Sequence, residues 1–419
     1  MIKLPYGHGD VALRLPPGAG CDTIVYPGAQ VTPIDGAAVL EQALAAPIAS
    51  PPLHELARGR SSAVILISDG TRLSPSHLFL PLLLRELERG GIPDDGITIV
   101  VALGAHRKHT EEELMRLAGS EVYRRVRVVN HSALAEDCEP VGTTSNGTPV
   151  AINRIVVQAE LRIATGNIEP HALVGVSGGV KALVPGVAAR ETIERNHSLS
   201  QSHKAQPGFP DNPVHRDLEE AQRLLPLHFL FNVVVNHRQQ PLAAFAGHVA
   251  EAHHAGVIEA RRLFLVEAKP DYDVVIASPG GYPKDTQLYQ TVKTMKNAAA
   301  HAKPGGAIIT VSRCQELFGN GTFQEWIETI QDRATMARKL QEQFVLGAHK
   351  TGHIDQLLKR NRIFLYSEMP PAAVELAGFI PIDDIEAAVA QLAGERPDVR
   401  MAIMPYGGLT YPLESDSLA

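Results

Sequence analysis

The chain has 419 residues, 44% of them hydrophobic and 20% charged, with a formal net charge of −7. This length and composition predict a globular protein of two to three domains, and the negative charge argues against nucleic-acid binding through lysine and arginine patches. The three cysteines, Cys21, Cys138 and Cys314, are widely spaced, which argues against a disulfide framework or a cysteine-rich metal site.

The N-terminal segment, MIKLPYGHGDVALRLP, lacks the apolar core of a secretory signal peptide. No later run approaches the length of a membrane span. We therefore expect a protein without membrane contact that works in the reducing cytoplasm.

Strand-like and helical patterns alternate in the first part of the chain. The apolar run 63–68 predicts a strand, and the amphipathic run 76–91 predicts a helix that ends at its two glycines. Further strands are expected at 97–103, 126–130 and 153–165. Such alternation indicates a parallel sheet with helices on its faces.

The second part of the chain repeats this pattern. Residues 241–268 are expected to form a long connecting helix, and further strands are expected at 273–278, 306–312, 362–366 and 399–404. We therefore predict two α/β domains with mostly parallel sheets, joined by a helical hinge. The N-terminal domain would cover residues 1–265 and the C-terminal domain 266–419.

Four polar segments follow predicted strands directly. They are Asp69–Arg72, His106, His171 and the loop Gly280–Pro283. Because ligands bind beyond the carboxyl ends of the strands in such sheets, we expect these segments to form one active site in an interdomain cleft.

Residues 166–197 concentrate side chains that suit a cofactor. The turn Ser177-Gly178-Gly179 suits a phosphate, because glycine lets the backbone approach closely. Lys181 could be a phosphate counter-charge or a nucleophilic amine. His171 precedes the turn, and His197 offers a nitrogen that suits a transition metal. Phosphate, amine and metal ligand together indicate an unusual cofactor.

The common nucleotide and zinc motifs do not fit this segment. In a Walker loop a Gly-Lys pair precedes serine or threonine, whereas here Val180 separates Gly179 from Lys181 and Ala182 follows. The segment is not a dinucleotide fingerprint, and the chain has neither H-E-x-x-H nor C-x-x-C.

An ordered set of motifs resembles the lactate racemase family, whose members use a nickel-pincer nucleotide. The matching pieces from 169 to 197 are Glu169-Pro170-His171, Ser177–Lys181, Pro185–Ala188, Glu191–Ile193 and Asn196-His197. The others are Asp69–Arg72, Gly104–Arg107 with Thr110 and Glu113, and Tyr289–Lys293 after Gly280–Pro283. Each piece is short, but their common order makes the resemblance specific.

Inverting the carbinol carbon of a 2-hydroxy acid by proton abstraction is difficult, because the neighbouring carboxylate resists a second negative charge. Reversible hydride transfer avoids this second negative charge. A base takes the hydroxyl proton of the substrate while the hydride leaves the carbinol carbon. Because the two antipodes present opposite faces, each antipode needs its own base. Histidines suit this work, since their usual pKa lies near neutral pH. His106 and His171 are the candidates.

The resemblance implies the remaining roles. Lys181 would hold the nickel-pincer nucleotide covalently as a thioamide, and His197 would ligate nickel. Residues expected against the nucleotide are Asp69, Gly70, Thr71, Arg72, Ser177, Gly178 and Gly179. Residues expected to bind substrate are Arg72, Tyr289, Gln290 and Lys293. The implied partners are a small 2-hydroxy acid and the enzymes that make the cofactor.

Some residues depart from the family pattern. Leu173 and Val176 stand where aromatic residues are common, so we expect a substrate longer or more polar than lactate. Other histidines, including His109, His253 and His254, receive no role. The alternatives are a nicotinamide-dependent dehydrogenase, which the missing fingerprint disfavours, and a non-catalytic nucleotide-binding or cofactor-carrier protein.

Overall fold

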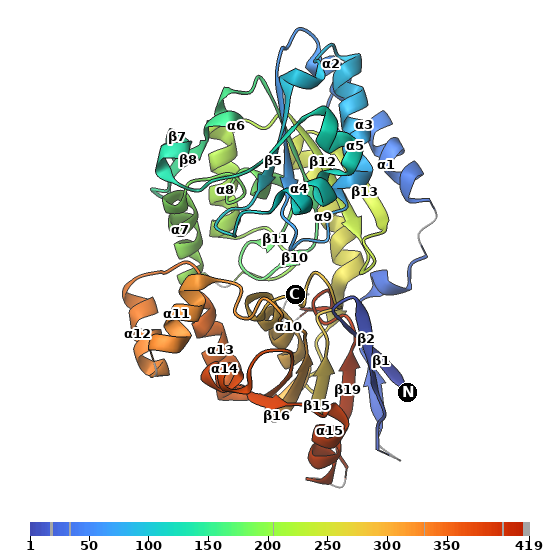
Figure 1. Ribbon diagram of the computed structural model, residues 1–419, viewed down its shortest axis with the longest axis vertical. Helices are drawn as coiled ribbons and strands as arrows, with labels where there is room; N and C mark the ends of the chain where they lie inside the picture. The colour runs from blue at the N-terminus through green and yellow to red at the C-terminus, as the bar shows by residue number, and fades with distance from the viewer. Residues whose placement is uncertain (17–19, 33–34, 204, 331, 396–397, 414–419) are drawn as a thin grey trace. The chain divides into compact units, whose positions relative to one another are not determined.

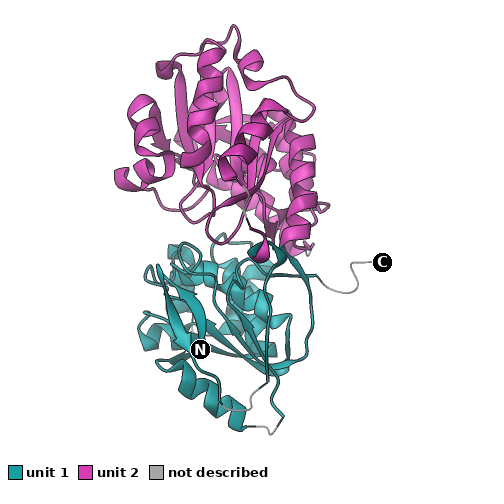
Figure 2. Ribbon diagram, turned by 90° about the vertical axis from the view of Figure 1, so that its right-hand side faces the viewer, with its two compact units in different colours: residues 1–29, 264–419 teal, residues 30–263 magenta. Residues whose placement is uncertain are grey.

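The computed structural model describes the chain except for residues 17–19, 33–34, 204, 331, 396–397 and 414–419. The protein divides into two compact units (Figure 2): unit 1 comprises residues 1–29 and 264–419, and unit 2 comprises residues 30–263. Both have the predicted α/β architecture, with helices flanking the strands (Figure 1).

Unit 2 contains a six-stranded sheet in the order β13-β12-β9-β4-β5-β6. Its strands are β4 (Ala63–Ser68), β5 (Ile97–Ala102), β6 (Arg127–Asn130), β9 (Leu161–Asn167), β12 (Phe229–Val235) and β13 (Pro241–Gly247). All neighbours run parallel except β13, which is antiparallel to β12. Strands β4, β9 and β12 are almost wholly buried, as parallel strands covered on both faces must be.

Helices and two hairpins complete unit 2. The helices are α1 (Gly36–Ala45), α2 (Leu53–Ala57), α3 (Ser76–Arg89), α4 (Glu111–Ala118), α5 (Ser120–Arg125), α6 (Arg154–Gln158), α7 (Arg190–Ser198), α8 (Pro213–Leu224) and α9 (Val249–Phe264). One hairpin pairs β7 (Cys138–Thr143) with β8 (Pro149–Asn153), and the other pairs β10 (Pro170–His171) with β11 (Gly175–Val176). Helix α9 ends at the boundary between the units.

Unit 1 contains an all-parallel sheet in the order β18-β17-β16-β15-β19-β3. Its strands are β3 (Cys21–Thr23), β15 (Tyr272–Ala277), β16 (Ala302–Val311), β17 (Arg362–Tyr366), β18 (Ile380–Ile382) and β19 (Met401–Met404). Outside it lie the hairpin β1 (Ile2–Tyr6) and β2 (Gly9–Leu13), and the parallel pair β14 (Leu265–Glu267) and β20 (Tyr411–Leu413).

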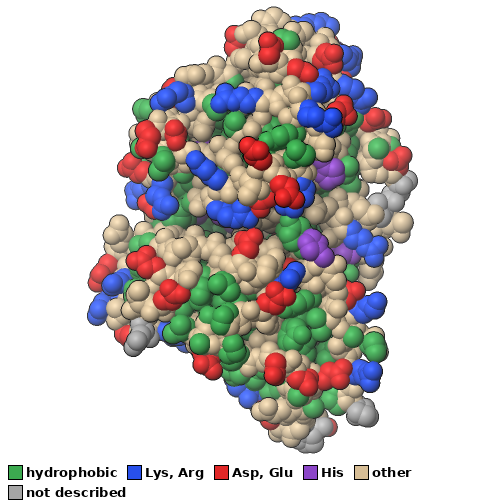
Figure 3. All heavy atoms as spheres, in the orientation of Figure 1, with side chains coloured by type: hydrophobic (Ala, Val, Ile, Leu, Met, Phe, Trp, Pro, Cys, Tyr) green, Lys and Arg blue, Asp and Glu red, His purple; other side chains and the backbone are tan. Residues whose placement is uncertain are grey.

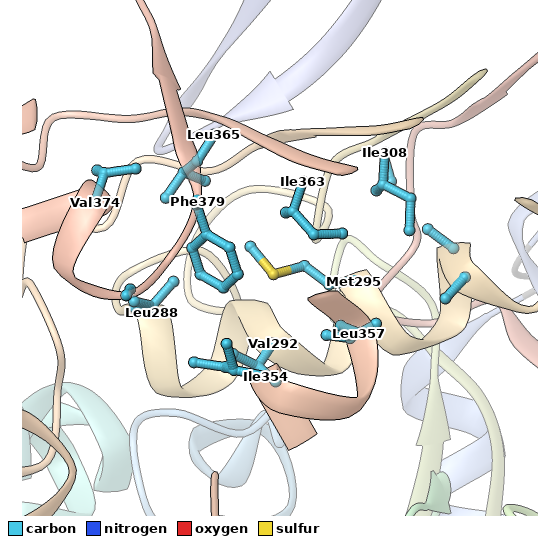
Figure 4. Close-up of a cluster of buried hydrophobic side chains, with 14 of the residues drawn as sticks. Leu288, Val292, Met295, Ile308, Ile354, Leu357, Ile363, Leu365, Val374 and Phe379 are labelled. Carbon is cyan, nitrogen blue, oxygen red and sulfur yellow. The ribbon is translucent and has the colours of Figure 1, made fainter. Parts of the chain in front are cut away.

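Two apolar clusters sandwich this sheet. On one face, α10 (Leu288–Ala299), α11 (Gly321–Thr329), α13 (His349–Arg360) and α14 (Pro371–Leu376) contribute buried side chains. Figure 4 shows part of this cluster, with Val292 and Met295 of α10 beside Ile354 of α13. On the other face, α15 (Ile385–Gly394) packs with Leu4 and Leu13 of the first hairpin. Helix α12 (Arg333–Glu342) packs on α13.

Two predicted elements differ from the structure. The expected strand 153–165 is interrupted by α6, because the Asn153 side chain accepts a hydrogen bond from the Ile155 amide at 3.1 Å and caps a short helix there. The expected helix 241–268 begins with β13 instead, and only its later part is helical, as α9. Pairing with β12 decided the conformation of this apolar segment.

The first 29 residues group with the C-terminal unit, whereas the predicted boundaries put residues 1–265 in a single N-terminal domain. The physical reason is strand pairing: β3 adds to the edge of the unit 1 sheet beside β19. These two strands are far apart in the sequence, so no local pattern of residues could predict that they pair.

The charged side chains are mixed on the face of the molecule drawn in Figure 3, where lysines and arginines alternate with aspartates and glutamates. Within the described ranges, none of the helices is both long and apolar enough to cross a membrane.

Candidate functional site

Three predicted site segments of unit 2 follow neighbouring strands. Asp69 follows β4, His106 lies four residues after β5, and His171 lies four residues after β9. Strand β4 pairs with both β5 and β9, and all three run parallel. Their carboxyl ends therefore meet at one edge of the sheet, as predicted for these three segments.

Asp69 organises the first part of this edge. Its Oδ2 lies 3.3 Å from Nδ1 of His106 and 3.7 Å from Nε of Arg72, while its Oδ1 accepts hydrogen bonds from the amide and hydroxyl of Thr71. Burial alone would raise the pKa of the Asp69 carboxyl, but His106, Arg72 and Thr71 hold it below its usual range. The ionised carboxylate fixes the His106 proton on Nδ1 and leaves a lone pair on Nε2.

His109, which received no role from the sequence, supports the same loop. Its Nε2 accepts a hydrogen bond from the Gly70 amide at 3.0 Å, and its Nδ1 donates to Glu113 at 3.2 Å. Glu113 also forms a capping box with Thr110 at the start of α4. Thr110 and Glu113, which belong to the motif that begins at Gly104, therefore cap α4. Glu113 also holds His109, which in turn positions the loop at Gly70.

His171 is held differently from His106. Its Nδ1 accepts hydrogen bonds from the amides of Leu173 at 3.2 Å and Val174 at 3.4 Å. In the neutral ring the proton consequently lies on Nε2, the opposite tautomer from His106. Val176 is fully buried within the β10–β11 hairpin, so its small side chain does not widen an open cavity there.

The turn Ser177-Gly178-Gly179 is fixed from inside the protein. The Ser177 amide donates to Glu169 O at 2.9 Å, and the Gly179 amide donates to Asn232 Oδ1 at 2.8 Å. Both glycines have positive φ, +77° and +56°, and a Cβ would come within 2.6 Å of Asn232 at Gly178 and 2.8 Å of the His253 ring at Gly179. The glycines are therefore required for packing, and two of the amides expected to bind phosphate already have protein acceptors.

Lys181 lies in the 3-10 turn Gly179–Ala182 that follows, and it is partly buried. Burial, and secondarily the charge of Arg72, lower the pKa of Lys181 to about 7 against the opposing effect of Glu169 and Asp69. A substantial fraction of this side chain is consequently a neutral, nucleophilic amine at neutral pH.

His197 of α7 is a partly buried, neutral imidazole. Burial, and then the charge of Lys181, lower the pKa of His197 to about 3. Its Nδ1 donates to Asn196 Oδ1 at 3.2 Å, and Asn196 is itself fixed by Val214 O and Asp217. The ring therefore offers Nε2 as an acceptor, the form in which histidine binds metals.

No three His, Cys, Asp or Glu side chains in the described part of the chain gather into a group able to hold a metal ion. The residues around Lys181 nevertheless fit a covalently attached, metal-carrying nucleotide. Lys181 would supply a neutral amine, and His197, on which the charge of Lys181 acts, would supply one oriented nitrogen for a metal. A cofactor that brings its own remaining ligands needs no further protein side chains on the metal.

The structure identifies two positioning residues that the sequence analysis missed, Asn232 and His253. Asn232 is fully buried in β12, an otherwise apolar strand of sequence FLFNVVV. His253 Nε2 donates to Ser177 O at 2.9 Å, and its ring stacks on His215 with centroids 5.9 Å apart. The sequence did offer a signal for Asn232, because it is the single polar residue of an otherwise apolar strand. It offered no comparable signal for His253.

The remaining candidates belong to unit 1. Tyr289, Gln290 and Lys293 all lie on the first two turns of α10. The Gly280–Pro283 loop follows β15 as predicted, and it leads into this helix.

Comparisons with known proteins give consistent results. A family model described as the lactate racemase N-terminal domain matches residues 6–208, and one described as the lactate racemase C-terminal domain matches residues 266–407. Lactate racemase of Thermoanaerobacterium thermosaccharolyticum is 35% identical over 344 residues, 81% of this chain and 80% of that protein. Lactate racemase of Lactiplantibacillus plantarum is 38% identical over 297 residues, 70% of each chain.

Solved structures also resemble this fold. The lactate racemase apoprotein from Thermoanaerobacterium thermosaccharolyticum aligns with a TM-score of 0.87 and 30% identity, covering 99% of both chains. A protein from Thermotoga maritima aligns with a TM-score of 0.71 and 19% identity, over 91% of this chain and 99% of that one, a likeness of fold alone.

The environment of Lys181 predicts its titration. After reductive methylation with ¹³C-formaldehyde, the NMR signal of Lys181 should titrate near pH 7, whereas exposed lysines titrate at about 10.4. Arg72→Gln should raise the Lys181 midpoint, because it removes a neighbouring positive charge. A Lys181 midpoint that coincides with those of the exposed lysines would contradict the burial argument.

The contact between His253 and Ser177 predicts a stability effect. His253→Ala should lower the free energy of unfolding by about 1–3 kcal/mol, because it leaves the buried Ser177 carbonyl without its donor. The adjacent, exposed His254→Ala is the matched control and should change it by less than about 0.5 kcal/mol. Urea denaturation measures both, and equal effects would remove the positioning role of His253.

Proposed function

Because the chain belongs to the lactate racemase family, we propose that it is a racemase or epimerase of 2-hydroxy acids that uses a nickel-pincer nucleotide attached to Lys181. The observation that carries this proposal is the pairing of a partly buried amine of lowered pKa, Lys181, with a partly buried neutral imidazole, His197. The nearby Asp69–His106 pair adds an oriented base.

Each cofactor-binding residue has a distinct role in this proposal. The Lys181 amine would carry the thioamide link, and His197 Nε2 would be the nickel ligand from the protein while Asn196 holds the ring. The loop from Asp69 to Arg72 and the turn Ser177-Gly178-Gly179 would hold the nucleotide. The cofactor, when bound, would supply a reversible hydride acceptor. Enzymes that make the cofactor are therefore required partners, and the free cysteines fit a cytoplasmic setting.

The two histidines handle the hydroxyl proton of the substrate. His106 accepts it on Nε2, and Asp69 stabilises the resulting imidazolium through Nδ1. His171 serves the other antipode. To hold a second proton on Nδ1, His171 must give up the two backbone hydrogen bonds from Leu173 and Val174. The two directions of the reaction therefore make different demands on the protein.

Substrate binding involves both charged and polar side chains. Arg72 and Lys293 pair with the substrate carboxylate, and Tyr289 and Gln290 hydrogen-bond its carboxylate and hydroxyl oxygens. Such contacts hold the carbinol carbon in one orientation, which is a prerequisite for transfer of its hydrogen.

The test of the function is to express the chain with the cofactor-making enzymes and to screen 2-hydroxy acids for racemisation. Intact mass of the same protein separates the alternatives. A covalent adduct on Lys181 with racemisation supports the proposal. An adduct without turnover of any acid would support a cofactor carrier, and activity that depends on added nicotinamide nucleotide would support a dehydrogenase.

Attachment and metal binding should be separable. Lys181→Ala should lose both the adduct and all activity, whereas His197→Ala should keep the adduct and bind nickel poorly, because only one of the two bonds is covalent. Intact mass and nickel content measure these outcomes, with the exposed Lys359→Ala as the control. Full nickel content in the Lys181 variant would exclude the covalent assignment.

Racemisation should require both histidines. His106→Ala and His171→Ala should each lower the racemisation rate by about 10²–10⁴-fold, because every turnover uses both acid–base groups. Polarimetry of the matured variants measures the effect, and His254→Ala should retain the parent rate. Should either variant racemise at the parent rate, that histidine has no catalytic role.

A further inference from the structure

A buried carboxylate lies where three elements of unit 2 meet behind the proposed metal ligand. Helices α7 and α8 pack against each other and against the hairpin of β7 and β8 (Figure 1). His197 lies near the end of α7, and residues 144–148 form the loop of the hairpin. Asp217 belongs to α8 and is fully buried.

Asp217 accepts four hydrogen bonds. Its Oδ1 accepts from the Thr144 hydroxyl at 2.6 Å and from the Asn146 side-chain amide at 3.3 Å. Its Oδ2 accepts from the Thr148 hydroxyl and from the Asn196 side-chain amide, both at 2.9 Å. A carboxylate can only accept hydrogen bonds, and a buried one is costly to leave without donors. Asp217 therefore dictates which way each of these groups points.

The carboxylate fixes the orientation of the Asn196 amide. Asn196 is fully buried, and its Nδ2 donates to Asp217 Oδ2 and to the backbone oxygen of Val214 at 3.1 Å. Both partners only accept hydrogen bonds, so exchanging the nitrogen and the oxygen of this amide would place its oxygen against two acceptors. The Asn196 oxygen consequently faces the other way, toward His197.

The orientation of Asn196 in turn sets the tautomer of His197. Asn196 Oδ1 lies 3.2 Å from Nδ1 of His197. Because an amide oxygen can only accept, Nδ1 carries the proton of the neutral ring and Nε2 keeps the lone pair. Two consecutive hydrogen bonds thus connect the Asp217 carboxylate to the imidazole.

We propose that Asp217, acting through Asn196, is the positioning residue that selects Nε2 of His197 as the nickel ligand. The inference rests on the proposed function, in which His197 binds nickel. Metal-binding histidines commonly donate their second nitrogen to a carboxylate or a carbonyl oxygen, which fixes the ring and makes it a stronger ligand. Here the amide of Asn196 stands between the ring and the carboxylate, and it passes on an orientation while both of its N–H groups are held.

A purely structural role of Asp217 predicts a different result. The hydrogen bonds from Thr144 and Thr148 fasten the hairpin loop to α8. Thr148→Val removes one hydrogen bond to Oδ2 of Asp217 but leaves the contact between Asp217 and Asn196. This variant is the matched control, because it loosens the hairpin without releasing Asn196.

The first test measures the tautomer of His197 in the full chain without cofactor. In protein labelled with ¹⁵N-histidine, the NMR shifts of the two ring nitrogens at neutral pH report which one carries the proton, and His197→Gln assigns the signals. We expect the proton on Nδ1 in the parent chain and in Thr148→Val. Asp217→Ala and Asn196→Leu should each shift the population toward the form with the proton on Nε2, because the Asn196 oxygen is released or removed.

Nickel binding by the matured chain gives a second readout. Asp217→Ala and Asn196→Leu should keep the adduct on Lys181, measured by intact mass. In competition with a chelator they should bind nickel about 10- to 100-fold more weakly, the usual effect of removing the group behind a metal ligand. Thr148→Val should keep the parent affinity. Asp217→Ala and Thr148→Val should both lower the midpoint of urea denaturation, so a loss of stability alone does not explain a difference in nickel affinity.

The outcomes separate this inference from the function on which it rests. A proton on Nε2 of His197 in the parent chain overturns the inference, and this measurement does not require any variant of Asp217 to fold. Unchanged tautomer and nickel affinity in Asp217→Ala, or equal changes in Thr148→Val, also overturn it and leave the racemase proposal standing. A parent chain that acquires no adduct from the cofactor-making enzymes contradicts the proposed function instead.

Discussion

The candidate site depends on one turn that holds a lysine in a partly buried position. The turn is held by the Asn232 side chain, the His253 ring and the backbone of Glu169. Because these contacts fix residues 177–179, Lys181 follows in a defined place where burial lowers its pKa to about 7. Its remaining charge in turn helps to keep His197 neutral. Loss of this turn would therefore change the pKa of Lys181 and of His197 together.

A second constraint is the choice of histidine tautomers at the edge of the sheet. Asp69 fixes the proton of His106 on Nδ1, whereas two backbone amides occupy Nδ1 of His171. Asp69 accepts the hydrogen bond from Nδ1 of His106, so the lone pair of this ring is on Nε2. At His171 the two amides already use the lone pair of Nδ1. Two residues of the same type therefore differ in chemistry because their hydrogen-bond partners differ.

Much of the fold was predictable because long apolar runs are locally specified. The runs at 63–68, 97–103 and 362–366 formed strands close to the expected bounds. The errors came where pairing or capping overrode local preference: Asn153 caps a short helix, and 241–247 joins β12 as an edge strand. The position of β3 beside β19 depends on residues nearly four hundred positions apart, which no local pattern encodes.

By itself, the sequence determined the α/β class, the order of the motifs and the residue types available for chemistry. These follow from hydrophobic periodicity and from residue identity, which are local properties. The tertiary structure decided which groups act on one another: that His109 and His253 position the loops of the site, that Gly178 and Gly179 are required by Asn232 and His253, and that Lys181 is desolvated. Hydrogen-bond partners, burial and pKa arise from contacts between distant segments, so only the folded chain could define them.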